Sequence, residues 1–149
     1  MSDTSIVFRP PTAIDGMPVW QLVKRCPPLD PNSVYCNLLQ CAHFSATSVA
    51  VDVDGQLSGF ISAYLIPDRP HTLFVWQVAV GEAARGQGLA RRMIEHILSR
   101  DTCRDVTHLE TTITKDNGAS WALFESVARS LKAEMNSEVY FDKTTHFDG

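Results

Sequence analysis

Trp76-Gln-Val-Ala-Val-Gly-Glu-Ala-Ala-Arg-Gly-Gln-Gly-Leu-Ala-Arg-Arg-Met-Ile94 is the stretch that decides the fold of this chain. β-Branched and aromatic residues dominate positions 73–80 and predict a strand, whereas the apolar spacing after Ala90 predicts a helix. Between them, Gly86 and Gly88 allow the backbone to turn sharply and leave its amides uncovered. A helix that begins at such a turn adds the positive end of its dipole. The stretch therefore predicts a strand, a phosphate-binding loop and a helix.

The spacing of the loop narrows the class of phosphate that it can bind. It contains no Gly-Lys-Ser/Thr, which excludes a P-loop, and the Leu-Ala after Gly88 does not fit a dinucleotide fingerprint. Arg85 can pair with the anion, and Ala90 is small enough for a diphosphate to lie beside the first helical turn. A glycine before a helix also occurs for turn geometry alone. The pattern Arg85-x-x-Gly88-x-Ala90, however, resembles the acyl-CoA pyrophosphate loop of the GNAT acetyltransferase superfamily.

Length and composition limit the classes of protein. A chain of 149 residues predicts one domain, residues 1–149. The net charge is −4 and no basic run is present, so we expect no nucleic-acid partner. The sequence has no N-terminal apolar core and no stretch of membrane-spanning length, and we expect a cytoplasmic protein without a membrane partner. The four cysteines show no Cys-x-x-Cys pair and no zinc-site spacing, which predicts reduced thiols and no metal.

The order of the predicted elements defines the fold class. We expect strands at residues 6–9, 47–53, 57–66, 72–80, 106–114 and 138–141. We expect one helix that ends at Cys26 and three more at residues 34–44, 86–99 and 117–131. Asp54-Gly55 predicts a hairpin and residues 67–70 another turn, so the sheet starts antiparallel. The helix at 86–99 makes the following strand parallel to its predecessor. This order predicts an α/β (α+β) fold with a mixed central sheet, an antiparallel meander and helices on both faces, as in the GNAT superfamily.

Two of the predicted helices carry candidate site residues. In the helix at 34–44, composition alone favours a buried side of Leu38, Leu39 and Phe44, with Tyr35 and Asn37 facing water. In the superfamily resembled, this segment overlies the acceptor site, which favours a site role for Tyr35 and Asn37. In the helix at 117–131, Asn117 is the predicted cap. The predicted buried side of that helix consists of Trp121, Leu123, Phe124, Val127 and Leu131.

A finer resemblance rests on a series of short motifs. They are Asp30-x-Asn-Ser33, Tyr35-x-Asn-Leu-Leu39, Cys41-x-His-Phe44, Pro67-x-x-Pro70, Trp76-Gln-Val-Ala-Val80, Ala84-Arg-Gly-Gln-Gly-Leu-Ala90, Leu109-Glu-Thr-Thr-Ile-Thr114, Asp116-Asn117 and Ala119-Ser120. Together they resemble the L-2,4-diaminobutyrate acetyltransferase family. The resemblance implies transfer of acetyl from acetyl-CoA to the N4 amine of L-2,4-diaminobutyrate in ectoine biosynthesis, by a cytoplasmic homodimer without metal. In that family a further strand usually follows the segment ending here at residue 149, and we expect this strand to be missing.

The resemblance also implies a donor site. Arg85, Gly86 and the amides of Gln87, Gly88, Leu89 and Ala90 are expected on the diphosphate of acetyl-CoA. The backbone of Val78, Ala79 and Val80 is expected along the pantetheine arm. A bulge in this strand would direct the amide of Val78 at the thioester carbonyl, although the residues alone predict only a buried strand. Asn117 can bind the CoA arm as well as cap its helix, and the cap alone would explain it equally well.

The expected acceptor site must hold the amino acid and remove a proton, because an alkylammonium has a pKa near 10. We expect Glu110 to act there as the base or as the ligand that fixes an ammonium; from its alternating strand alone it would be a solvent-facing carboxylate. Asp30 can share this role. Asn37, Thr112 and backbone donors are candidates for the α-carboxylate. Trp76, with Gln77 beside it, is either core or a wall of the acceptor pocket.

The general acid and the competing functions remain open in the sequence. The tyrosine that usually protonates the thiolate in this superfamily is replaced by Phe124, so Tyr35 or water takes over, or the thiolate leaves unaided. His43 beside Phe44 is more often structural than catalytic. The competing interpretations are another acetyl-CoA-dependent amine acetyltransferase, acting on polyamines, amino sugars or protein termini, and a non-catalytic acyl-CoA sensor. A nucleotide-binding module is a more distant third.

Overall fold

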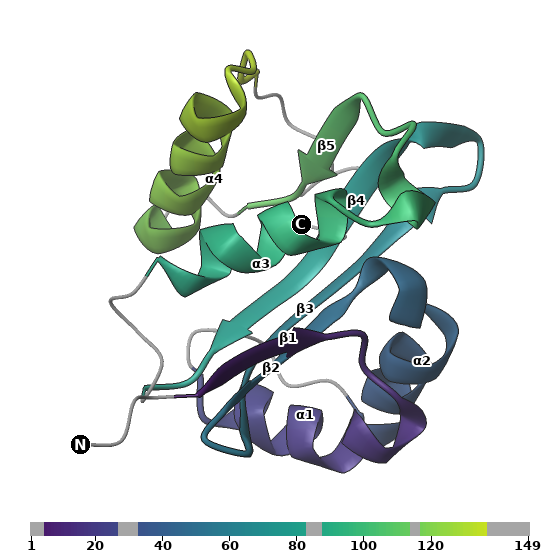
Figure 1. Ribbon diagram of the computed structural model, residues 1–149, viewed down its shortest axis with the longest axis vertical. Helices are drawn as coiled ribbons and strands as arrows, with labels where there is room; N and C mark the ends of the chain where they lie inside the picture. The colour runs from purple at the N-terminus through teal and green to yellow at the C-terminus, as the bar shows by residue number, and fades with distance from the viewer. Residues whose placement is uncertain (1–4, 27–32, 83–87, 114–116, 137–149) are drawn as a thin grey trace, which may run out of the picture. The chain divides into compact units, whose positions relative to one another are not determined.

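The computed structural model describes residues 5–26, 33–82, 88–113 and 117–136 of the chain (Figure 1). The chain divides into two compact units, residues 1–111 and 112–149, and each is described by itself. The second unit contains helix α4 (Gly118–Leu131). The strand expected at residues 138–141 lies outside the described part of the chain.

The first unit follows the predicted order of elements. Its strands are β1 (Ile6–Arg9), β2 (Val49–Val53), β3 (Gln56–Ile66), β4 (Arg69–Val80) and β5 (His108–Thr111). Its α-helices are α1 (Gly16–Lys24), α2 (Val34–His43) and α3 (Leu89–Leu98), with short 3-10 helices at Ala13–Asp15, Ser45–Thr47 and Asp101–Cys103.

The sheet of the first unit is mixed, as expected. Its strand order is β1-β2-β3-β4-β5, in which β1 to β4 pair antiparallel and β4 pairs parallel with β5. The β2–β3 hairpin turns at Asp54 and Gly55, whose φ angles of 50° and 81° are both left-handed. Such a two-residue turn matches the twist of the flanking strands, which explains why Asp-Gly predicted it.

Helices cover both faces of this sheet. Phe60 and Ala79, which are neighbours on β3 and β4, form a buried cluster with Val19, Leu22 and Val23 of α1 and Cys41 of α2. The adjacent residue Gly59 points the other way, toward α3, because a Cβ there would lie 3.2 Å from Met93 Cε. The α1–α2 face and the α3 face are therefore opposite sides of one sheet, as the predicted fold class requires.

Several element ends differ from the predicted ones. Strand β2 begins only at Val49, because residues 45–47 form a 3-10 turn in which Thr47 Oγ1 donates to the Ala63 carbonyl at 2.5 Å. Strand β4 begins at Arg69, so the turn before it is confined to residues 67 and 68. Strand β5 is shorter than expected at both ends, and α3 begins at Leu89 rather than at residue 86.

Two predictions of burial are wrong. Asn37 is fully buried rather than facing water, because positions 37, 40 and 41 form the packed side of α2. Its amide donates to Gln40 Oε1 at 2.8 Å, which lowers the cost of burying two polar side chains. Leu131 is 46% exposed, because α4 ends there, before Lys132 in a left-handed conformation. Tyr35 faces water as composition favoured, and Phe124 and Val127 are buried as expected.

Candidate active site

A bulge in β4 lies at the centre of the candidate site. The β3–β4 pairing passes from Ser62 opposite Gln77 to Ala63 opposite Val75, so Trp76 is opposite no residue of β3. One extra residue in a strand bends it and increases its twist. The bulge that was expected from the resemblance is therefore confirmed.

The pairing of β4 with β5 ends just before this bulge. The two strands pair from Thr72 opposite His108 to Val75 opposite Thr111, and no described residue continues the β5 ladder beyond Val75. Among the described residues, the β5 side of β4 is therefore an open strand edge at Val78, the kind of edge to which an extended ligand can bind.

The direction of the backbone groups along this edge follows from one hydrogen bond. The amide of Gly81 donates to the Ser58 carbonyl at 2.7 Å, which continues the β3–β4 register. In an antiparallel ladder every second pair is bonded, so Ala79 and Gln77 direct their N–H and C=O groups at β3. The amide of Val78 points away from β3, toward the open edge. Ala79 therefore offers that edge no backbone hydrogen bond, whereas Val78 can, as the donor-site hypothesis requires.

Helix α3 starts from a glycine, which allows the sharp turn that the loop motif predicted. Gly88 has φ 63° and ψ 25°, a left-handed conformation, and Leu89 and Ala90 form the first turn of the helix. The amides of a first helical turn have no partner within the helix and can bind an anion. Arg85, Gly86 and Gln87 lie outside the described residues.

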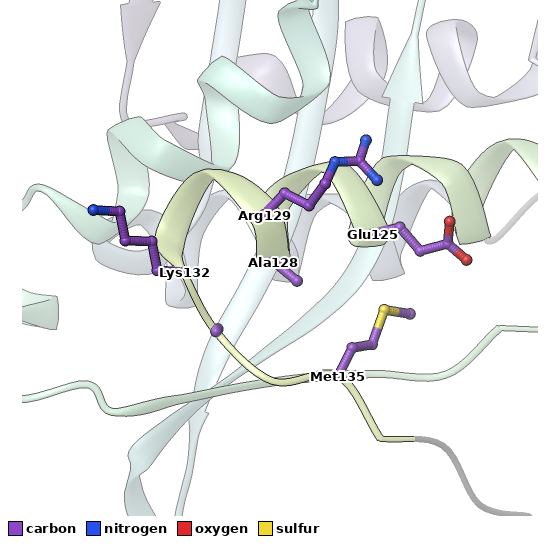
Figure 2. A pocket seen from close by; sticks show the side chains of 6 residues that line it. Glu125, Ala128, Arg129, Lys132 and Met135 are labelled. Carbon is purple, nitrogen blue, oxygen red and sulfur yellow. The ribbon is translucent and has the colours of Figure 1, made fainter.

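The residues of the second unit are described separately from this site. Asn117 Oδ1 accepts the amide of Ser120 at 3.2 Å, which confirms the predicted cap of α4; its role toward CoA stays a prediction. Thr112 is exposed. A hollow of about 370 Å³ lies at the end of α4, and Figure 2 shows the side chains that line it. Its lining, Glu125, Ala128, Arg129, Lys132, Ala133 and Met135, includes none of the predicted site residues.

An aromatic cluster lies on the α1–α2 face, next to the bulge. The ring centroid of Tyr64 lies 5.5 Å from Phe44, 5.3 Å from Phe74 and 6.1 Å from Trp76. Trp76 itself remains 44% exposed. Of the two interpretations left open for Trp76, the structure excludes the core residue, because a core side chain would be covered. A wall beside the open edge of β4 is consistent with its exposure.

Glu110 has a partner that the sequence did not indicate. The guanidinium of Arg69 binds its carboxylate with both Nη atoms, Nη1 to Oε1 at 3.1 Å and Nη2 to Oε2 at 3.3 Å. Glu110 is opposite Phe74 in the parallel register, and paired residues point to the same face. The ion pair therefore lies on the face that carries the aromatic cluster. The only sequence signal for Arg69 was its place inside the Pro67-x-x-Pro70 motif.

The remaining acceptor-site candidates are in different environments. Asn37 and Gln40 are fully buried, and among the described residues neither Asn37 Oδ1 nor Gln40 Nε2 has a hydrogen-bond partner. Gln77 is 8% exposed, whereas the Tyr35 ring is 68% exposed and His43 is exposed at the end of α2. Asp30 lies outside the described residues.

Two further features bear on the class of protein. The described segments contain no cluster of three or more His, Cys, Asp and Glu side chains that could hold a metal ion. None of the helices in those segments has the length and apolar character of a membrane span. All four cysteines, Cys26, Cys36, Cys41 and Cys103, are free thiols. Burial raises the pKa of the Cys41 thiol to about 12.

The parted strands and the glycine-started helix correspond to a known family. Residues 17–128 match the model of the acetyltransferase (GNAT) family, and the chain therefore belongs to this family. It is 58% identical over 142 residues to the L-2,4-diaminobutyric acid acetyltransferase of Methylotuvimicrobium alcaliphilum, which covers 95% of this chain and 83% of the relative. The enzyme of the same name from Vibrio cholerae is 46% identical over 143 residues, a match that covers 96% of this chain and 83% of that enzyme. Within the GNAT family, the chain belongs with the L-2,4-diaminobutyric acid acetyltransferases.

Solved structures agree with this assignment. The diaminobutyrate acetyltransferase EctA from Paenibacillus lautus, in complex with L-2,4-diaminobutyric acid and coenzyme A, is 40% identical and has a TM-score of 0.84. The match covers 87% of this chain and 78% of that one. The aminoglycoside N-acetyltransferase AAC(6')-Iy, 18% identical with a TM-score of 0.70 over 95% of both chains, shares the fold alone. The family resemblance inferred from the motifs is therefore confirmed.

Proposed function

We propose that this chain transfers the acetyl group of acetyl-CoA to the N4 amine of L-2,4-diaminobutyrate, giving N4-acetyl-L-2,4-diaminobutyrate for ectoine biosynthesis. The observation that carries the reaction class is the open edge of β4 beyond Val75, toward which the Val78 amide points. The substrate follows from the similarity to the L-2,4-diaminobutyric acid acetyltransferases. As in the family resembled, we expect a cytoplasmic homodimer.

The proposed donor site consists mainly of backbone groups, with the side chains of Arg85 and Asn117. The chain would hold acetyl-CoA through Val78 and Val80 along the β4 edge and through residues 85–90 at the start of α3, with Asn117 on the CoA arm. The left-handed Gly88 supports this fit, because it lets a chain leave β4 and enter α3 with uncovered amides. When bound, acetyl-CoA supplies an activated acetyl group.

The role of Val78 is electrostatic. Attack on a thioester places negative charge on its carbonyl oxygen, and an N–H donor already fixed in a strand stabilises that charge without reorganising. Val78 is suited to this role because its amide is directed away from β3 while its residue stays in the ladder, opposite Ile61. The neighbouring Trp76, displaced by the bulge and exposed, would limit the space open to the acceptor.

Proton transfer uses the acceptor side of the site. The attacking amine must be neutral, so a carboxylate or water takes its proton. Glu110 is the candidate for this acceptor-side role, as base or as the ligand that fixes an ammonium, and Asp30 can share it. No tyrosine stands at position 124, where Phe124 is 6% exposed, and the thiolate is protonated by Tyr35 or water or leaves unaided.

A direct assay tests the proposal. The purified chain is mixed with acetyl-CoA and L-2,4-diaminobutyrate, free thiol is followed with a chromogenic reagent, and the acetylated nitrogen is located by NMR. We expect thiol release with acetylation at N4, and weak activity with putrescine or lysine. Comparable rates with polyamines would favour another amine acetyltransferase. Binding of acetyl-CoA without turnover would favour an acyl-CoA sensor.

A further inference from the structure

The Arg69–Glu110 ion pair lies on the α1–α2 face, and the proposed reaction assigns no role to its arginine. Its two contacts, at 3.1 and 3.3 Å, form a bidentate fork, although Arg69 and Glu110 are 41 residues apart in the sequence. The side chains stay partly accessible, with 48% of Arg69 and 25% of Glu110 exposed. An exposed pair of this kind contributes little to stability, so its geometry needs another explanation.

The pair lies beside the wall that borders the open edge of β4. Glu110 is opposite Phe74, which contacts Tyr64, and Tyr64 in turn contacts the exposed Trp76. Aromatic rings and a carboxylate therefore share one face of the sheet at the place where β4 and β5 part. Such a surface suits a cation, because the rings exclude water and the carboxylate supplies the opposite charge.

The Glu110 carboxylate lies some distance along β4 from the reacting centre. Phe74, the neighbour of Glu110, precedes Val78 by four residues, which corresponds to about 13 Å of strand. The thioester carbonyl is assigned to the Val78 amide, so the reacting N4 amine lies near Val78. Glu110 lies nearer the other end of the substrate, where diaminobutyrate carries its α-ammonium.

We infer that Arg69 is a positioning residue, which holds the Glu110 carboxylate so that it binds the α-ammonium of the acceptor amino acid. The inference rests on the proposed function and assigns to Glu110 the ammonium-ligand role in place of the base. A carboxylate has about four lone-pair sites, and the two N–H groups of Arg69 occupy two of them. The fork thus fixes the orientation of the remaining two before the substrate arrives, which reduces the entropy lost on binding.

This arrangement makes the pair a determinant of substrate specificity. L-2,4-Diaminobutyrate has an α-ammonium to bind, whereas 4-aminobutyrate has the same carbon chain, carboxylate and terminal amine without it. A site that orients a carboxylate for an ammonium discriminates against the analogue that lacks the charge, because the lone-pair sites that Arg69 leaves open then lose water without gaining a donor.

The test crosses enzyme variants with these two acceptors. We measure kcat and KM for both, and by calorimetry their Kd in the presence of CoA, for the wild type and for Arg69→Gln, Arg69→Lys and Glu110→Gln. Loss of a charge-assisted hydrogen bond should raise KM and Kd for diaminobutyrate by roughly 10- to 100-fold. The values for 4-aminobutyrate should change by less than about threefold, and kcat at saturation should change little. Arg69→Lys, which keeps the positive charge but cannot make the bidentate contact, should restore part of the affinity for diaminobutyrate that Arg69→Gln loses.

Controls separate the possible failures. Arg104→Ala removes an exposed arginine outside the site and should leave the ratio between the two acceptors unchanged. An equal loss for both acceptors in Arg69→Gln, or an effect on kcat alone, would overturn the inference in favour of a structural or proton-transfer role. A wild-type chain that binds 4-aminobutyrate as well as diaminobutyrate would overturn it too. Failure of the proposed function has a different signature, because the wild type would then neither bind nor acetylate diaminobutyrate.

Discussion

The amide of Gly81 donates to the carbonyl of Ser58 at 2.7 Å, and this bond fixes the direction of the backbone groups of β4. Because bonded and non-bonded pairs alternate, the amide three residues earlier, that of Val78, faces away from β3. A group that takes no part in the β3–β4 ladder can be removed without breaking the sheet. The role of Val78 can therefore be tested by changing its backbone.

Val78→Pro removes this amide, and Val78→Ala keeps it. Proline is tolerated at a strand position whose N–H does not enter a ladder. We expect Val78→Pro to lower kcat by about 10²- to 10³-fold, the typical effect of losing one oxyanion donor. Val78→Ala should stay within about threefold of the wild type. Steady-state kinetics and thermal melts check this; similar activity losses in the two variants would show that the side chain, not the amide, matters.

Gly88 offers a second test, because its φ of 63° is a conformation that L-residues avoid. Gly88→Ala should cost about 1–2 kcal/mol of stability from backbone strain. It should also weaken acetyl-CoA binding, since the strain is relieved by moving the start of α3. Chemical denaturation and calorimetry with CoA measure the two effects.

A matched control for Gly88 exists at the β2–β3 hairpin. Gly55 has a φ of 81°, and no heavy atom lies within 4 Å of a Cβ built there. Gly55→Ala should therefore suffer a comparable strain without any change in the Kd for CoA. If both variants bound CoA as the wild type does, the start of α3 would not be the diphosphate site.

Local turn chemistry explains which parts could be predicted from the sequence. Asp54-Gly55 and the glycine before Leu89 are short-range signals; the first produced the expected hairpin, and the second produced a helix start, three residues later than expected. The bulge at Trp76 depends on the register between two strands, which no single strand encodes. It was expected only because the motifs resembled a family in which this strand bulges.

Tertiary contacts explain the rest. Asn37 was assigned to the solvent on polarity, but its position on the packed side of α2 and its bond to Gln40 keep it buried. The Arg69–Glu110 fork joins two residues that are distant in the sequence, so it became visible only when β4 and β5 were paired. Sequence reasoning therefore identified candidate residue types at the site but not their partners.

We expect His96 to make the stability of the first unit depend on pH. Its ring stacks on Phe8 with centroids 5.5 Å apart, and its Nδ1 lies 3.3 Å from Arg100 Nη2. Burial lowers the pKa of His96 below its usual value of 6.5, and the charge of Arg100 lowers it further. The unfolded chain therefore binds this proton more readily, so the contribution is complete above about pH 6.5 and declines as the pH falls through the folded-state pKa. The melting temperature measured from about pH 8 to about pH 5 should show this decline, and His96→Gln should flatten it. An unchanged slope in His96→Gln would contradict the assignment.

Arg9 joins β1, β2 and the segment before α1, and its removal should destabilise the first unit. Its guanidinium binds Asp15 at 2.8 and 2.9 Å and Asp52 at 2.8 and 3.2 Å. Asp15 is 7% exposed, and its hydrogen bonds with Arg9 lower the pKa of this carboxyl. Arg9→Met keeps the apolar stem but leaves a nearly buried carboxylate without its cation, which should lower the free energy of unfolding by about 3 kcal/mol. Asp52→Asn, at a more exposed partner, should cost only about 1 kcal/mol.

In acid the difference in stability between wild type and Arg9→Met should shrink. The reason is that stability from a depressed carboxyl pKa is complete above the unfolded-state value of 3.8 and is lost as the pH falls below it. Urea denaturation at neutral pH and in acid measures both effects, and a difference that persisted unchanged in acid would mean that packing of the Arg9 stem, not its charge, stabilises this corner.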